Sequence, residues 1–182
     1  MDKLPYTLIR SGRRTLGMEL KGGQLVVRAP YLVSRARIDR FVEENRAWAE
    51  KALQKAAAAA DVPKLTEAEL KALKKAAKDY IPGRVAHYAA LAGVQVNRIA
   101  IRCQKTKWGS CSAKGNLNFN CLLMLLPAEV IDSVVVHEVC HRRHMDHSAA
   151  FYAEIGRIFP DYKKHHGYLK EHGAEIMARM PE

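Results

Sequence analysis

The stretch "VVVHEVCHRRHMDHS", residues 134–148, is the feature that most constrains how this chain folds. It places four of the eight histidines within eleven consecutive positions. On a helix, side chains four residues apart lie on the same face, so His137 and His141 are predicted to bind one metal ion together. Glu138 follows the first histidine and would reach a water molecule rather than the metal. This H-E-x-x-H pattern predicts a metal-dependent hydrolase.

The chemistry explains why these residue types occur together. Zinc prefers neutral imidazole nitrogen, and catalytic zinc sites use three protein ligands with one position left for water or substrate. The metal lowers the pKa of that water and polarises a substrate carbonyl, while a nearby carboxylate accepts the proton of the water. We therefore expect Zn²⁺ as the cofactor, Glu138 as the general base and a third ligand close by.

Two histidines compete for the third position. His147 lies six residues after His141, which is the offset of the third histidine in the longer HExxHxxGxxH motif. A turn at residues 145–146 would let its side chain point back at the metal. His144 is the alternative, because at seven residues after His137 it lies on nearly the same helix face. The offset favours His147.

Two other interpretations compete with a catalytic zinc site. The histidines could be ordinary residues of the surface and core, but the three valines before His137 predict a helix with one buried face. A structural zinc site could include Cys140, three residues after His137. Structural sites usually contain paired cysteines, and such a site would leave Glu138 without a role. We expect Cys140 to pack in the core instead.

The first third of the chain predicts a small β-unit followed by a helix. Residues 6–30 alternate in short runs with turns at Ser11-Gly12 and Gly22-Gly23, as strands of a hairpin require. Ser34 then precedes an amphipathic stretch, residues 35–60, and is predicted to cap its helix. We expect an N-terminal antiparallel β-unit with one long helix.

A second helix is predicted to follow. Thr66 and Glu69 form a capping-box pattern at its start, and Gly93 is typical of its C-terminal end. Pro82 would break this helix or kink it.

Two strands should lead into the helix that carries the histidines. Residues 94–104 alternate as a strand does, and residues 116–125 form another strand after a turn. Pro127 suits the first turn of the histidine helix. These elements predict an α+β fold in two parts, residues 1–62 as the β-unit and helix and residues 63–182 as a zincin-like metallopeptidase core with a small sheet against the histidine helix. The sequence leaves open whether the two parts pack as one body.

Several blocks in this order resemble those of the YgjP-like metallopeptidases, a bacterial and archaeal family of metal-dependent hydrolases distantly similar to SprT-like and WLM zinc proteases. The blocks are "RSGRRTLGMEL" with "GGQLVVRAP", "FVEENRAWAEKAL", "KTKWGSCSAKGNLNFN", "VVVHEVCHRRHMDHSAAFY" and "FPDYKKHHGYL". The resemblance implies that His137, His141 and His147 bind zinc and that Glu138 is the catalytic base. It implies no particular substrate.

The "WGSC" block around Trp108 has two interpretations. It could support an antiparallel sheet beside the active-site helix, or form an edge strand that pairs with an extended substrate peptide. The strand that follows it places Asn116, Asn118 and Asn120 on one face. Tyr152, Tyr162 and Tyr168 are each candidates to donate a hydrogen bond to a developing oxyanion.

Composition bounds the partners and the compartment. The formal charge is +11, and residues 1–60 carry 12 basic against 6 acidic side chains. Such an excess favours anionic partners or serves solubility. No apolar run reaches the roughly 18 residues of a membrane span, and the N-terminus lacks a signal-peptide pattern. The four cysteines show no CxxC pair, which is typical of reduced thiols in the cytoplasm.

Three hypotheses for the function follow. The first is a zinc metallopeptidase acting on a protein or peptide. The second is a metal-dependent hydrolase of a non-peptide amide or ester. The third is a nucleic-acid-associated protein whose metal site acts on DNA-bound proteins, with a positive surface formed by Arg10, Arg13, Arg14, Arg28, Arg35 and Arg37.

Overall fold

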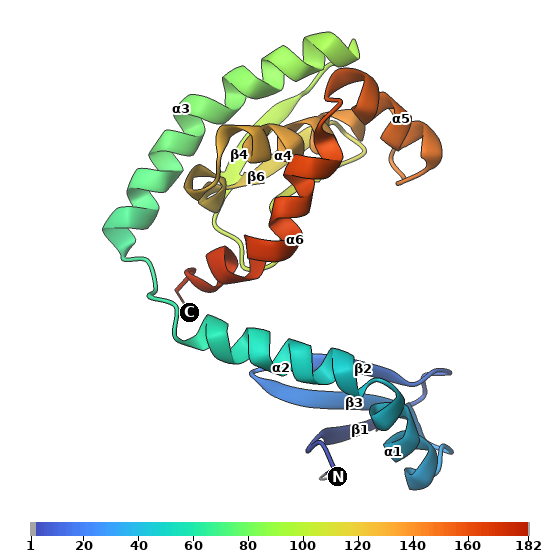
Figure 1. Ribbon diagram of the computed structural model, residues 1–182. Coiled ribbons are helices and arrows are strands. Elements are labelled where there is room, and N and C mark those ends of the chain that lie inside the picture. Colours follow the sequence, from blue (N-terminus) through green and yellow to red (C-terminus); the bar gives the residue numbers. More distant parts are fainter. Residues whose placement is uncertain (1–2, 182) are drawn as a thin grey trace. The chain divides into compact units, whose positions relative to one another are not determined.

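The computed structural model describes residues 3–181, except for the side chains of residues 58–60, and has a mixed α+β fold (Figure 1). The chain divides into two compact units, Met1–Asp61 and Val62–Glu182. Each unit has its own three-stranded sheet. Within the described residues, none of the helices combines the length and the apolar character needed to span a bilayer.

The sheet of the first unit consists of β1 (Thr7–Ser11), β2 (Gly17–Lys21) and β3 (Gln24–Pro30), in the order β1-β3-β2. β2 and β3 form the expected antiparallel hairpin, whose turn residues Gly22 and Gly23 have φ angles of 57° and 75°. β1, however, pairs with β3 in parallel. The prediction of an antiparallel unit is therefore wrong for β1, and the sheet is mixed.

Arg10 provides a physical reason for the parallel pairing. Its Nη1 donates hydrogen bonds to three carbonyl oxygens at or just after the end of β3, at 2.7–3.0 Å: those of Pro30, Tyr31 and Val33. Ser11 at the end of β1 accordingly lies opposite Pro30 at the end of β3. Side-chain alternation identifies the faces of a strand but not the direction of its partner, so the sequence did not reveal this contact.

The predicted single helix over residues 35–60 is two helices, α1 (Arg35–Glu44) and α2 (Arg46–Ala60). The helix breaks at Asn45, where φ is −110° and ψ is 17°. The Asn45 side chain donates a hydrogen bond to the carbonyl of Phe41, which competes with helix continuation. Ser34 caps α1 as predicted. The helices and the sheet share one buried cluster: Leu25, Val27, Ala29, Ile38, Val42 and Ala49.

Three of the arginines considered for a positive surface have partners within this unit. Arg10 holds the carbonyl groups after β3, Arg28 pairs with Glu19, and Arg35 pairs with Asp39. Arg28 and Arg35 are thus paired with acidic side chains of the same unit, and these contacts give the nucleic-acid hypothesis no support.

The second unit begins with the long helix α3 (Glu67–Ala92). Thr66 and Glu69 form the predicted capping box, and Gly93 ends the helix with a φ of 62°. The helix runs through Pro82 without interruption.

The second sheet consists of β4 (Arg98–Arg102), β5 (Gly109–Cys111) and β6 (Asn116–Asn120), in the order β4-β6-β5. β5 is antiparallel to β6, but β4 is parallel to it, so the expected antiparallel sheet is again mixed. The strand predicted to reach residue 125 ends at Asn120, whose side chain accepts a hydrogen bond from the Leu122 amide. A 3₁₀ turn, η1 (Cys121–Leu125), follows.

α4 (Ala128–Cys140) occupies the centre of this unit, followed by α5 (Ala149–Ile158) and α6 (Tyr162–Ala178). It contacts α3, α5, α6 and β5 (Figure 1). Arg84 of α3 donates two hydrogen bonds of 2.7 Å to the Asp132 carboxylate of α4. α4 is thus packed against three helices and a strand, and it carries His137 in its last turn.

Candidate metal centre

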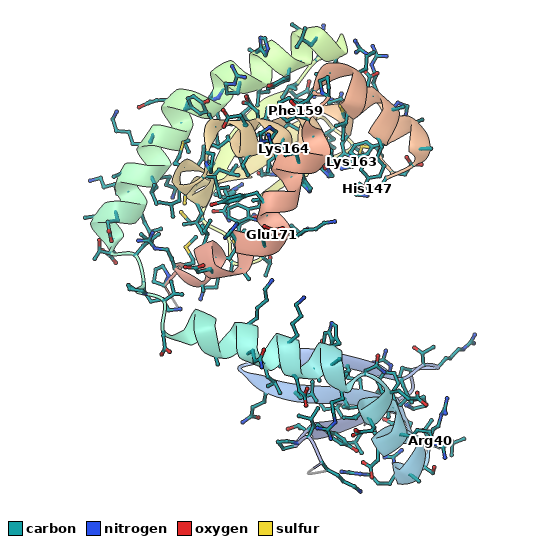
Figure 2. All side chains as sticks on the ribbon, in the orientation of Figure 1. Arg40, His147, Phe159, Lys163, Lys164 and Glu171 are labelled. Carbon is teal, nitrogen blue, oxygen red and sulfur yellow. The ribbon has the colours of Figure 1, made fainter. Side chains whose placement is uncertain are left out.

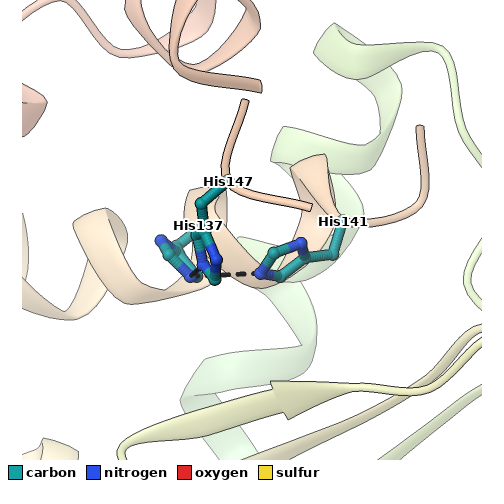
Figure 3. Close-up of side chains that lie close together, drawn as sticks. All are labelled: His137, His141 and His147. Carbon is teal, nitrogen blue, oxygen red and sulfur yellow. Dashed lines mark hydrogen bonds between the residues drawn. The ribbon is translucent and has the colours of Figure 1, made fainter. Parts of the chain in front are cut away.

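The structure brings His137, His141 and His147 together (Figure 3). His137 lies in the last turn of α4, His141 caps its C-terminal end, and His147 lies just before α5. The Nε2 atom of His137 is 3.2 Å from Nε2 of His141 and 3.2 Å from Nε2 of His147. All three candidate ligand atoms lie within 4.8 Å of one another.

The helix ends before the predicted turn, but the chain bends where the sequence predicts. α4 ends at Cys140, a turn covers residues 141–143, and a bend follows at Met145 and Asp146. The turn contains no residue with positive φ, so it does not need the glycine of the longer motif. Ser148 then caps α5 by accepting a hydrogen bond from the Phe151 amide. The short connection leaves His147 facing the end of α4.

Hydrogen bonds at Nδ1 orient two of the rings. Nδ1 of His141 donates to the carbonyl oxygen of His144 at 2.9 Å, which leaves Nε2 with the free lone pair that a metal requires. Nδ1 of His137 lies 2.9 Å from the Tyr162 hydroxyl. The sequence does not reveal this second partner, because Tyr162 belongs to α6 and lies 25 residues after His137. His144, the rival third ligand, contributes its backbone to the site, and its side chain lies outside the cluster.

Two of the three histidines, His137 and His141, favour the neutral form. Burial, together with the neighbouring histidines, lowers the pKa of His137 to about 3. Burial also lowers the pKa of His141. Neutral imidazole is the form that coordinates a metal, so the site is prepared for binding near neutral pH.

Glu138 is buried against β5, with 6% of its surface exposed. A β-carbon added to Gly109 would lie 2.6 Å from its Oε1 atom, so only glycine leaves room for this carboxylate. Burial raises the pKa of Glu138 to about 8, against the opposing charge of Lys107. The "WGSC" block therefore has a structural role that the sequence left open: its glycine admits Glu138. An isolated glycine within a strand is the signal that would have pointed to such a close approach.

Cys140 packs in the core as expected. Its side chain is fully buried, and burial raises the pKa of its thiol to about 12. A neutral, buried thiol of this kind is a poor metal ligand. The cluster of metal-binding groups in the described residues includes the three histidines and not this cysteine.

A cavity of about 590 Å³ opens beside the histidines. Two of the three candidate oxyanion donors, Tyr152 and Tyr162, line it, while Tyr168 lies against His172 with ring centres 4.2 Å apart. The ring of His166, also in the cavity wall, lies parallel to the His137 ring at 5.5 Å.

Two of the three separations between the donor nitrogens match those around a zinc ion. Two imidazole nitrogens bound to one zinc at 2.0–2.1 Å are separated by about 3.3 Å, close to the two 3.2 Å separations found here. All three donors are imidazoles, two of them with Nδ1 engaged elsewhere. The residues present are therefore suited to a divalent metal of this kind.

Comparison with known proteins agrees with this chemistry. Residues 59–172 match the model of the YgjP-like metallopeptidase domain. Among solved structures, the crystal structure of the metallopeptidase zymogen of Pyrococcus abyssi abylysin has 21% sequence identity and a TM-score of 0.46, and the similarity covers 50% of this chain and 93% of that one. A search of curated proteins gives no significant match. Because the family model spans more than half of the sequence and covers the histidine helix, the chain belongs to the YgjP-like metallopeptidase family and is a metal-dependent hydrolase.

Proposed function

We propose that the protein is a zinc-dependent peptidase with a zincin-like core, in which His137, His141 and His147 hold the metal and Glu138 is the general base. The observation that carries this proposal is the convergence of three Nε2 atoms at the end of α4. A bound zinc ion would supply Lewis acidity, which acidifies water and polarises the scissile carbonyl.

The residues of the chain provide the remaining chemistry. The missing side chain at Gly109 leaves room for the Glu138 carboxylate. Because burial raises the pKa of Glu138, this carboxylate is suited to accept and release protons near neutral pH. Tyr162 orients His137, so Tyr152 is the better placed of the cavity tyrosines to donate a hydrogen bond to a developing oxyanion.

The sheet favours a peptide over a smaller substrate. β5 is an edge strand, and Gly109 within it contacts Glu138. An extended peptide paired with the open edge of β5 would pass beside the general base, with its backbone amides hydrogen-bonded to the strand. A non-peptide amide or ester would use the same metal and base but not this edge.

The cellular setting is part of the proposal. All four cysteines are free, including Cys103 and Cys121, whose sulfur atoms lie only 3.0 Å apart. The proposal of a cytoplasmic protein rests on the sequence, in which the four cysteines form no CxxC pair.

The decisive experiment pairs metal analysis with proteolysis. We expect about one zinc per chain, hydrolysis of unstructured proteins, and a loss of roughly 10²–10⁴ in rate for Glu138→Gln with the zinc content unchanged. If the Glu138→Gln enzyme stays active, a residue other than Glu138 is the general base. Parallel assays with non-peptide amides and esters, and with duplex DNA added, separate the other two hypotheses from this one.

A further inference from the structure

The cavity beside the histidines extends along one face of α6. Five residues of α6 line it: Tyr162 at its start, and Lys163, His166, Gly167 and Lys170 at helical spacing. Residues three, four and seven positions apart share one face of a helix, so these side chains form one wall opposite His137 and His147. A volume of about 590 Å³ is within the range of small-ligand sites and admits one side chain of a substrate.

Gly167 has no side chain, so no group projects into the cavity at the middle of this helix face. A β-carbon added there would meet no atom within 4 Å, so the space beside the helix is open rather than filled by a neighbour. Glycine inside a helix is destabilising by roughly 0.5–1 kcal/mol relative to alanine. Packing against a neighbouring segment therefore does not explain the glycine at this position, and its missing side chain leaves the cavity open there.

The cavity wall is positively charged. Lys163 and Lys170 both line it, and none of the residues that line it is acidic. Lys163 is exposed and has no ion-pair partner among residues 3–181. Figure 2 labels Lys163 at the start of α6 and His147, which both line the cavity. A divalent ion held by the histidines would add to the same positive potential.

These observations concern the substrate of the proposed peptidase and rest on that function. We infer that the cavity is a specificity pocket for a substrate carboxylate next to the scissile bond, held by the ammonium group of Lys163. A carboxylate accepts hydrogen bonds only, and an ammonium group donates only, so the two are complementary. The carboxylate is either an Asp or Glu side chain or the C-terminus of the peptide.

The test uses zinc-loaded full-length enzyme and matched peptides. One series carries Glu, Gln or Lys at each position flanking the cleaved bond, and a second compares a free C-terminal acid with its amide. We expect kcat/KM to favour Glu over Gln at one position, or acid over amide, by about three- to tenfold, the range between an exposed ion pair and a charge-assisted hydrogen bond. The position that responds identifies the source of the carboxylate.

Three variants assign the preference to the cavity. Lys163→Ala should bring the ratio of kcat/KM for the Glu peptide to that for the Gln peptide close to one. Lys163→Glu should make the enzyme prefer the peptide that carries Lys at the same position. Lys164→Ala is the matched control, because Lys164 is the adjacent exposed lysine but does not line the cavity. Its ratio should equal that of the wild type.

A binding measurement separates this inference from the proposed function. Fluorescence anisotropy of the same peptides on zinc-loaded Glu138→Gln reports the preference without any hydrolysis. If the wild type cleaves no peptide but still binds carboxylate peptides selectively, the proposed peptidase function is wrong and the specificity pocket stands. Equal affinity for Glu and Gln peptides, or a preference that survives Lys163→Glu, would overturn the pocket.

Discussion

A β-carbon on Gly109 of β5 would lie 2.6 Å from Oε1 and 2.7 Å from Cγ of Glu138 on α4. Real β-carbons do not approach other atoms so closely, so strand and helix meet here only because position 109 has no side chain. Gly109→Ala must therefore displace the carboxylate or the strand. We expect zinc content to be retained and kcat to fall by about tenfold or more, because a general base misplaced by about 1 Å loses much of its effect.

The control for Gly109→Ala is Gly83→Ala on α3, which lies outside the cavity lining and where an added methyl group meets no atom within 4 Å. Its zinc content and kcat on a short peptide of small residues should be measured beside those of Gly109→Ala. A Gly109→Ala enzyme with wild-type kcat would show that Glu138 does not act from the position seen here.

His147 and His144 give a direct comparison of two neighbouring histidines. His147→Ala removes one of the three converging Nε2 atoms and should weaken zinc affinity strongly. His144→Ala should change it little, because His144 acts through its carbonyl oxygen, which alanine keeps. Competition with a chelating dye measures both affinities. The reverse order would make His144 the third ligand.

The hydroxyl of Tyr162 on α6 should strengthen metal binding by orienting the His137 ring. Tyr162→Phe keeps the ring but removes the hydroxyl that lies 2.9 Å from Nδ1 of His137. Loss of such a partner typically costs 10- to 100-fold in metal affinity or activity, and we expect a decrease in zinc affinity within that range. The corresponding control is Tyr152→Phe, a cavity tyrosine without a hydrogen bond to His137, which should leave zinc affinity unchanged.

Which features could be predicted from the sequence depends on how far apart the contacting residues lie. The capping box at Thr66 and the helix end at Gly93 were predictable because each depends on residues within one turn. The approach of the three histidines follows likewise from spacing within eleven positions.

Contacts between distant segments could not be predicted in this way. Tyr162 reaches His137 across 25 residues, and Gly109 meets Glu138 across two elements of different type. The parallel pairing of β1 is accompanied by hydrogen bonds from Arg10 to carbonyl groups about 20 residues away. Periodicity identifies the buried face of each element but carries no information about which element covers that face.

The metal-free protein should show a pH dependence with two opposing contributions. Burial lowers the pKa of His137 to about 3, so the unfolded state binds more protons between about pH 6.5 and 3 and stability falls as pH is lowered there. Burial raises the pKa of Glu138 to about 8, so the folded state binds more protons between about pH 4.5 and 8. The Glu138 contribution is therefore lost as pH rises through that range.

Glu138→Gln isolates the second contribution, because it removes the titrating group but keeps its shape. With chelator present, urea unfolding of both proteins at pH 5, 6.5 and 8 gives the free energy of unfolding. The wild type should lose stability relative to the variant between pH 5 and 8, on the order of a few kcal/mol. A constant difference would mean that Glu138 is ionised in the folded state throughout this range.

The ion pair between Arg84 and Asp132 should be the main polar contact that fixes α4 to α3. Both hydrogen bonds to the carboxylate are 2.7 Å long, the Asp132 side chain is only 11% exposed, and the Tyr88 hydroxyl also donates to it. Asp132→Ala leaves the guanidinium without its partner in a partly buried place, which should lower the free energy of unfolding by about 2–4 kcal/mol. The matched control is Asp79→Ala on α3, which breaks an exposed pair with Lys75 and should cost less than about 1 kcal/mol. Urea unfolding of the zinc-loaded variants measures both, and equal losses would show that the buried pair does no more than a surface one.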